Sequence, residues 1–274
     1  MRPKESGGAF GRLVRRVTTR YAAGVAACAI ATVVPLASAA NLRMQAGAYV
    51  TAGDIYCNIV RGARIQDYLA SGQTFSIPVL WLCSLLIISL GAVCLLMPPQ
   101  NDIERMRLLA SRSRTSYWAH RIAAVTGYVA FQLIWRLMCC VAIALALKGS
   151  PGLGSLSADA AGLFAMEGPV AWGVECLLRS CCLEFAVVLV MSLVAGGIAV
   201  IVSAPVGVAA LAGYVTVSVF TGLPVLVPNL LMLHRYVEYE AAGAPLLWLA
   251  VGLLPLGAVF GLLFTNLRTI DFLH

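Results

Sequence analysis

Residues 185 to 233 contain no aspartate, glutamate, lysine or arginine. About 20 apolar residues in a helix cross the roughly 30 Å hydrocarbon core of a bilayer. This run is therefore long enough for two membrane-spanning helices, and Pro205 and Gly207 would place a tight turn between them. The composition agrees, since 61% of the 274 residues are hydrophobic and only 11% are charged. The sequence thus predicts an all-α integral membrane protein.

Six apolar runs of spanning length occur in the chain, and together they form one membrane domain, 21–267. A basic segment, 1–20, precedes this domain and a short tail, 268–274, follows it. The loop 41–74 shows no pattern of a folded domain, and the loop 149–171 is expected to be partly helical. The predicted transmembrane helices are residues 21–42, 75–97, 122–147, 172–204, 206–228 and 245–267.

The distribution of positive charge predicts how these helices are oriented. Cytoplasmic loops of membrane proteins carry an excess of lysine and arginine. In a six-span arrangement one side holds the basic residues of segment 1–20, five arginines between the second and third spans, and Arg268. We therefore expect a multi-pass protein of the cell membrane with both termini in the cytoplasm. The net charge of +7 is then a signal of topology, and no nucleic-acid partner is expected.

The N-terminal segment has a helical pattern of its own. Phe10, Leu13, Val14 and Val17 recur at helical spacing, and arginines occupy the opposite face. The pattern predicts a short amphipathic helix lying on an anionic membrane surface, and the alternative is a disordered basic tail that only sets topology. A second alternative is cleavage after the signal-peptidase-like residues 37–39, although the long basic lead and the five later spans favour a signal anchor.

Residues 105 to 121, RMRLLASRSRTSYWAHR, form a charged island between two apolar runs. Arg107, Arg114 and Arg121 are seven residues apart, so a helix would place them on one face, with Trp118 beside them. A continuous helix would not place the leucines and the arginines of this island on separate faces. We therefore expect the element to break near residues 111–114. On composition alone, a basic loop that fixes topology explains the island.

The wider pattern resembles the membrane subunits of type-2 ABC exporters, which are six-span permeases without an ATP site of their own. The resemblance rests on residues 106–135, where an Arg-Ser-Arg segment precedes Tyr117 and Trp118, and an aromatic third span follows. Arg121 occupies a position where such permeases often have a lysine. The amphipathic N-terminal segment and the turn at Pro205 also suit that family.

This resemblance implies that residues 102–121 rest in a cleft of a separate ABC ATPase subunit, whose closure switches the membrane helices between two states. ATP and Mg²⁺ would bind to that partner, because this chain lacks a Gly-x-x-x-x-Gly-Lys-Ser/Thr loop and needs no cofactor itself. A second copy or a homologous permease would complete the pathway, and Pro224 and Pro228 would bend the end of the fifth span into a re-entrant segment. The residues expected to couple to the ATPase are Arg105, Arg107, Arg112, Arg114, Trp118 and Arg121.

Four charged residues fall inside or at the edge of the third and fourth spans. A charge near the middle of a bilayer costs roughly 2.5–3.5 kcal/mol and usually has a partner. Arg136 and Glu184 lie at similar depths in adjacent antiparallel spans, so we expect them to pair, whereas Glu175 and Arg179 are four residues apart and would pair at the outer surface. The polar patch could line a substrate path, or be a structural ion pair or an outer re-entrant segment.

Other activities find little support in the residues. The chain has three histidines and no His-Glu-x-x-His motif, and its serines have no histidine at a matching depth, so an intramembrane enzyme is not expected. Most of the nine cysteines lie in apolar runs, where cysteine behaves as a small apolar residue. The remaining alternatives are a non-transporting membrane protein (an assembly factor, sensor or immunity protein) and a substrate-capturing subunit of an uptake system.

Overall fold

In the computed structural model, the described part of the chain contains helices and no strand. Side chains are described from Ala27 onward in the first helix and from Ser116 onward in the third long one. The all-α prediction is confirmed for this part of the chain. The structure describes residues 9–46, 49–63, 77–96, 114–164, 172–221, 223, 225–235, 251–254, 256–262 and 265.

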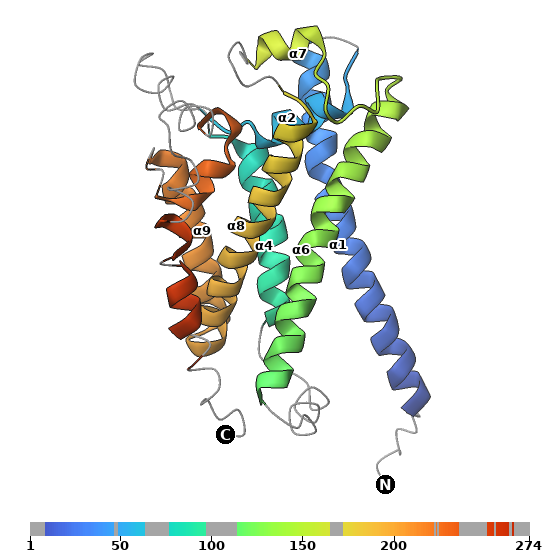
Figure 1. Ribbon diagram of the computed structural model, residues 1–274. Coiled ribbons are helices and arrows are strands. Elements are labelled where there is room, and N and C mark those ends of the chain that lie inside the picture. Colours follow the sequence, from blue (N-terminus) through green and yellow to red (C-terminus); the bar gives the residue numbers. More distant parts are fainter. Residues whose placement is uncertain are drawn as a thin grey trace.

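Four helices are long and apolar enough to cross a membrane, and Figure 1 shows them running alternately up and down. They are α1 (Ala9–Ala46), α4 (Val79–Leu96), α6 (Arg114–Ala146) and α8 (Val174–Ile201). The chain is a multi-pass membrane protein by the length and apolarity of these helices. Two shorter apolar helices follow, α9 (Ala204–Phe220) and a stretch within Val251–Leu262.

Helix α1 joins two elements that the sequence analysis treated separately. Residues 9–46 form one continuous helix of 38 residues, so the predicted amphipathic segment runs without a break into the first span. The alanine-rich stretch 22–31 has high helix propensity, which explains why no break occurs there. Residues 37–39, the alternative cleavage site, lie inside this helix, where Ser38 is fully buried.

The predicted fifth span, 206–228, ends earlier in the structure. Helix α9 stops at Phe220, and the chain continues into a short 3₁₀ helix, η1 (Val227–Leu231). The side-chain amide of Asn229 donates hydrogen bonds to the carbonyls of Thr221 and Leu223, at 2.7 and 2.8 Å. These bonds satisfy carbonyls at the end of a helix that would otherwise lack partners in an apolar surrounding.

A second difference lies in the loop 41–74, for which no folded unit is expected from the sequence pattern. Residues Ala52–Val60 form helix α2, and all nine of them are buried. Thr51 and Asp54 form a reciprocal cap, in which the Thr51 hydroxyl accepts from the Asp54 amide and the Asp54 carboxylate accepts from the Thr51 amide. In Figure 1, α2 lies at the upper end of the bundle, beneath α7 (Ala158–Leu163).

The loop before α7 accepts hydrogen bonds from the first amides of α2. The amides of Ala52 and Gly53 donate to the carbonyls of Ser150 and Gly152, at 2.9 and 3.0 Å. Asn58 donates to the Ser38 hydroxyl at 3.0 Å, which ties α2 to α1. Every polar group named here has a partner, as burial inside a bundle requires.

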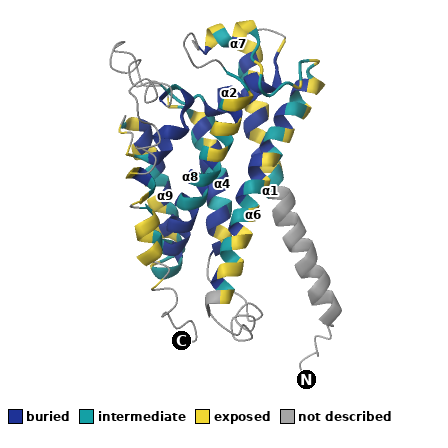
Figure 2. Cartoon of the chain, in the orientation of Figure 1, coloured by how far each residue is buried: buried dark blue, intermediate teal, exposed yellow. Residues whose placement is uncertain are grey.

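The buried side chains form two clusters, which Figure 2 shows in blue where the helices meet. One joins α4, α6, α8 and α9 with the segment after α9, and the other joins α1, α2, α6 and α7 at the upper end. Large apolar side chains such as Phe131, Ile134 and Met138 face outward from α6. An outward apolar face of this kind suits a lipid surrounding.

Gly207 allows α9 to pack closely against α8. A Cβ atom at this position would lie 2.5 Å from the Ala195 carbonyl oxygen and 2.7 Å from the Ala199 methyl group. Gly213 lies on the same helix, and a Cβ atom there would have no neighbour within 4 Å. Replacing Gly213 by alanine therefore tests helix propensity alone, whereas replacing Gly207 also tests the packing between α8 and α9.

We expect Gly207→Ala to lower the melting temperature of the purified protein. Overpacking costs typically 1–3 kcal/mol, which exceeds the gain of roughly 1 kcal/mol from replacing a helical glycine by alanine. The matched control, Gly213→Ala, should leave the melting temperature unchanged or raise it. Tryptophan fluorescence during heating in detergent measures both, and equal effects of the two substitutions would contradict the close α8–α9 packing.

Candidate functional site

The centre of the bundle contains a buried ion pair between α6 and α8. The Arg136 guanidinium donates to both carboxylate oxygens of Glu184, with Nη1 2.7 Å from Oε1 and Nη2 bonded to Oε2. Arg136 is 3% exposed and Glu184 5% exposed. Each lies roughly 15 Å from the nearer end of its helix, Ala146 or Val174. The structure thus brings together Arg136 and Glu184, the two residues expected to pair because they lie at similar depths in adjacent spans.

Two other helices contribute polar contacts to this pair. Ser84 of α4 accepts a hydrogen bond from Arg136 Nη1 at 2.6 Å. Tyr56 of α2 places its ring against the guanidinium, 5.1 Å from ring centroid to Cζ, and its hydroxyl donates to Glu184 Oε2 at 3.4 Å. Further hydrogen bonds offset part of the cost of burying two charges, and the contacts with Ser84 and Tyr56 supply such bonds here.

Tyr56 remains a proton donor in this setting. Burial raises the pKa of Tyr56 well above its ordinary value, the Glu184 carboxylate raises it further, and the Arg136 guanidinium opposes the rise. The hydroxyl therefore stays protonated at neutral pH and can donate to the carboxylate. Sequence reasoning missed Tyr56 and Ser84 because only the fold brings them to the charges.

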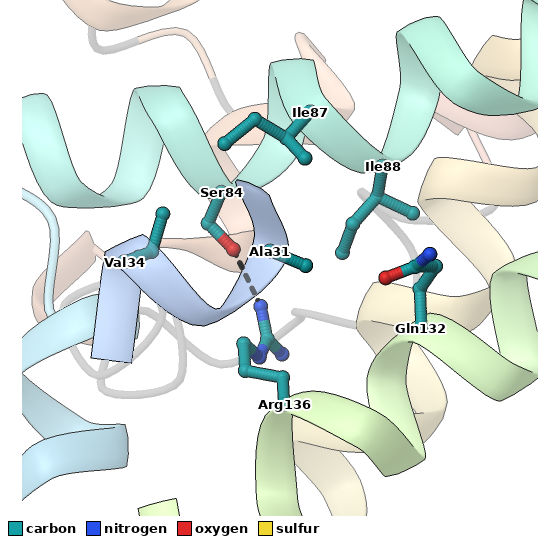
Figure 3. A pocket seen from close by; sticks show the side chains of 7 residues that line it. All are labelled: Ala31, Val34, Ser84, Ile87, Ile88, Gln132 and Arg136. Carbon is teal, nitrogen blue, oxygen red and sulfur yellow. Dashed lines mark hydrogen bonds between the residues drawn. The ribbon is translucent and has the colours of Figure 1, made fainter. Parts of the chain in front are cut away.

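Two polar atoms beside the pair have no hydrogen-bond partner in the described part of the chain, Arg136 Nε and Gln132 Oε1. Both residues line a small cavity between α1, α4 and α6, and Figure 3 shows their side chains beside it. Ser84 also lines the cavity, and the remaining walls are apolar. The cavity has room for about one water molecule.

The lower end of α6 carries part of the predicted coupling element. Arg114 is the first described residue of α6, and most of the stretch where the break is expected, residues 111–113, lies outside the described residues. Arg121 donates from Nη1 to the Leu95 carbonyl at 3.1 Å and lies 5.0 Å from the ring centroid of Tyr117. Arg121 thus binds the last turn of α4. Its positive charge there also interacts favourably with the negative end of the helix dipole. Arg105, Arg107 and Arg112 lie outside the described residues.

Trp118, one of the residues expected to couple to the ATPase, is buried in the structure. Its side chain is 2% exposed, and its ring meets that of Tyr117 edge to face with centroids 5.5 Å apart. A ring so completely covered packs inside the protein, where a large aromatic side chain buries more apolar area than at a lipid boundary. Trp118 therefore stabilises the lower end of α6 by packing.

The second predicted pair lies at the upper end of α8. Arg179 Nη2 is 3.1 Å from Glu175 Oε1, and the two side chains are 42% and 87% exposed. Exposed pairs of this spacing contribute about 0.3–0.5 kcal/mol. The predicted pair is therefore formed, and it lies at the surface of α8.

Arg235 is a buried charge between the predicted fifth and sixth spans. It is 1% exposed and donates to the carbonyls of Ser218, Val219 and Thr221, to the Asn229 side chain, and to the Ala63 carbonyl. Most of these acceptors are free carbonyls at the end of α9, which have no partners within the helix. No sequence signal could reveal this role, because the acceptors are backbone atoms.

Metal chemistry has no candidate ligands in the part of the chain that the structure describes, since no three His, Cys, Asp or Glu side chains gather there. All nine cysteines are described and are free thiols. No family model, curated protein or solved structure matches the chain. The arrangement of the residues is therefore the basis for assigning a function.

We expect Glu184→Gln to destabilise the protein severely. Removing one partner of a buried pair costs about 3–5 kcal/mol, because the remaining charge is left uncompensated. The double substitution Arg136→Met with Glu184→Leu removes both charges and should recover most of the lost stability. The measurement is the yield of monodisperse protein and its melting temperature after purification in detergent.

Glu175→Gln is the matched control, because Glu175 lies on the same helix in an exposed pair. It should change the melting temperature little, since exposed pairs contribute at most about 1 kcal/mol. A double variant as unstable as Glu184→Gln alone would show that the pair is not what holds α6 and α8 together.

Proposed function

We propose that this chain is the permease subunit of an ATP-driven exporter whose ATPase is a separate chain. The observation that supports this most is the construction of α6, which joins a basic lower end to the buried ion pair in a single helix. Arg114 and Arg136 are roughly 33 Å apart along that helix. A force applied near Arg114 would therefore reach the centre of the bundle without crossing a loop.

The contact between Arg121 and Leu95 extends this link to a second helix. Arg121 of α6 binds the carbonyl of Leu95 in the last turn of α4, so the lower ends of α4 and α6 would move together. The segment that connects these helices contains Arg105, Arg107 and Arg112. Arginine suits a docking role because its guanidinium forms paired hydrogen bonds with carboxylates on a partner.

In this proposal α9 and the helix within Val251–Leu262 are the fifth and sixth spans, and the basic ends face the cytoplasm. The turn between α8 and α9 suits the exporter family that the sequence resembles, and η1 would be the re-entrant segment expected after the fifth span. ATP and Mg²⁺ belong to the partner ATPase, and a second permease copy or a homologous permease completes the pathway.

The test is purification of the tagged full-length chain in mild detergent, followed by mass spectrometry of the bound proteins and an ATPase assay. We expect a stoichiometric ABC ATPase and vanadate-sensitive ATP hydrolysis. Arg114→Glu should reduce the bound ATPase at least tenfold, because it places a negative charge where a carboxylate partner is expected.

Arg179→Glu is the matched control, because Arg179 lies at the opposite end of the bundle from Arg114. This variant should retain the ATPase at the level of the unaltered protein. A pure, stable preparation without any ATPase would overturn the proposal and favour a non-transporting membrane protein. Normal transport by Arg114→Glu at equal expression would remove the coupling role of the basic end.

A further inference from the structure

Helix α2 lies at the upper end of the bundle (Figure 1) and reaches the Arg136–Glu184 pair through Tyr56. Tyr56 has no exposed surface and contacts both partners of the pair. Its hydroxyl donates to Glu184 Oε2 at 3.4 Å and accepts from Arg136 Nη2 at 3.5 Å. Its ring packs against the guanidinium, with 5.1 Å between the ring centroid and Cζ. Tyr56 thus fills space next to both charges that water would otherwise occupy.

The position of α2 affects how easily the two charges can separate. A separated guanidinium and carboxylate each need new hydrogen-bond partners, and a dry interior offers them no water in place of each other. All nine residues of α2 are buried, so the docked helix excludes water on the upper side of the pair. The pair is therefore most costly to separate while α2 is docked.

The attachment of α2 allows only a docked or a released state. Its first amides are bonded to its own cap and to carbonyls of the loop before α7, and Asn58 donates to the Ser38 hydroxyl of α1. An isolated helix of this length is not stable, so release would break these bonds together. The apolar side chains of α2 belong to a cluster separate from the one that joins α4, α6, α8 and α9. Release of α2 would therefore leave that second packing in place.

We propose that α2 is a lock on the Arg136–Glu184 pair, so that the pair separates only when α2 leaves its seat. Tyr56 is the positioning residue of this lock, because its hydroxyl bonds to both charged groups. The linkage is reciprocal: a change that breaks the pair loosens α2, and a change that loosens α2 weakens the pair. The lock is a property of this chain alone and does not depend on an ATPase partner.

Cys57 is a natural reporter of the release of α2, because it is a free thiol on this helix and is fully buried. The experiment exposes the full-length chain in lipid nanodiscs to N-ethylmaleimide at a series of temperatures. Mass spectrometry measures how fast Cys57 is modified, and tryptophan fluorescence measures the melting of the whole protein. We expect Cys57 to react well below the melting transition, because α2 is released while the bundle stays folded.

Tyr56→Phe removes the hydroxyl and keeps the ring. It should raise the rate of Cys57 modification at least fivefold, because the hydrogen bonds to the charged groups are lost. Tyr214→Phe is the matched control, since the Tyr214 hydroxyl accepts a bond of similar length, 3.3 Å, from the Val227 amide after α9. This variant should leave the rate unchanged.

A charge-free background distinguishes the lock from simple packing of the tyrosine. With Arg136→Met and Glu184→Leu in place, the Tyr56 hydroxyl has no charged partner. Adding Tyr56→Phe to this background should then change the rate of Cys57 modification less than twofold, because the coupling between the sites is gone.

Modification of Cys57 only in step with melting would refute the lock, because α2 would then open only with the whole fold. This comparison uses the unaltered protein and holds even where a variant does not fold. An absent effect of Tyr56→Phe, or an equal effect with and without the two charges, would also refute it, because Tyr56 would then hold α2 without the pair.

Discussion

The rest of the structure depends on the pairing of Arg136 with Glu184. Neither charge is stable alone in an apolar interior, so the antiparallel helices α6 and α8 must keep these two residues at the same level. That requirement fixes how far α6 and α8 can slide along each other, because a larger shift would break the hydrogen bonds of the pair. Ser84 of α4 and Tyr56 of α2 also bond to the pair, because additional hydrogen bonds offset part of the cost of removing the charges from water.

Helix α2 shows how the same requirement extends to backbone groups. A buried helix of nine residues has amide and carbonyl groups at its two ends that lack partners within the helix and that water cannot reach. The Thr51–Asp54 cap and the carbonyls of Ser150 and Gly152 satisfy the first of these amides. The loop before α7 is therefore part of the core, and its glycines are needed for close approach: a Cβ atom on Gly149 would overlap the Val50 carbonyl.

Sequence reasoning could find the features that follow from helical rise and apolar length. The pairing of Arg136 with Glu184 is such a feature, since counting residues from each span end places both near the middle of the bilayer. It could not find α2, because nine residues hold too few turns for a clear period, and the Thr-x-x-Asp pattern at its start is only a weak cap signal. Arg235 was equally hidden, because its acceptors are carbonyls that become free only when α9 ends at Phe220.

A consequence of this construction is that α6 cannot respond at one end alone. Its lower end is bound to α4 by Arg121. Its middle is bound to α8 by Arg136 and to α1 by Trp135, whose indole donates to the Cys28 carbonyl and the Thr32 hydroxyl. A shift of α6 along its axis would have to break the bidentate pair or carry α8 with it. Charged pairs in a dry interior have few intermediate arrangements of low energy, since a half-separated pair loses attraction without regaining water. Coupling between distant sites requires an element with two discrete arrangements. In this bundle, the Arg136–Glu184 contact would be that element, with the pair either formed or broken.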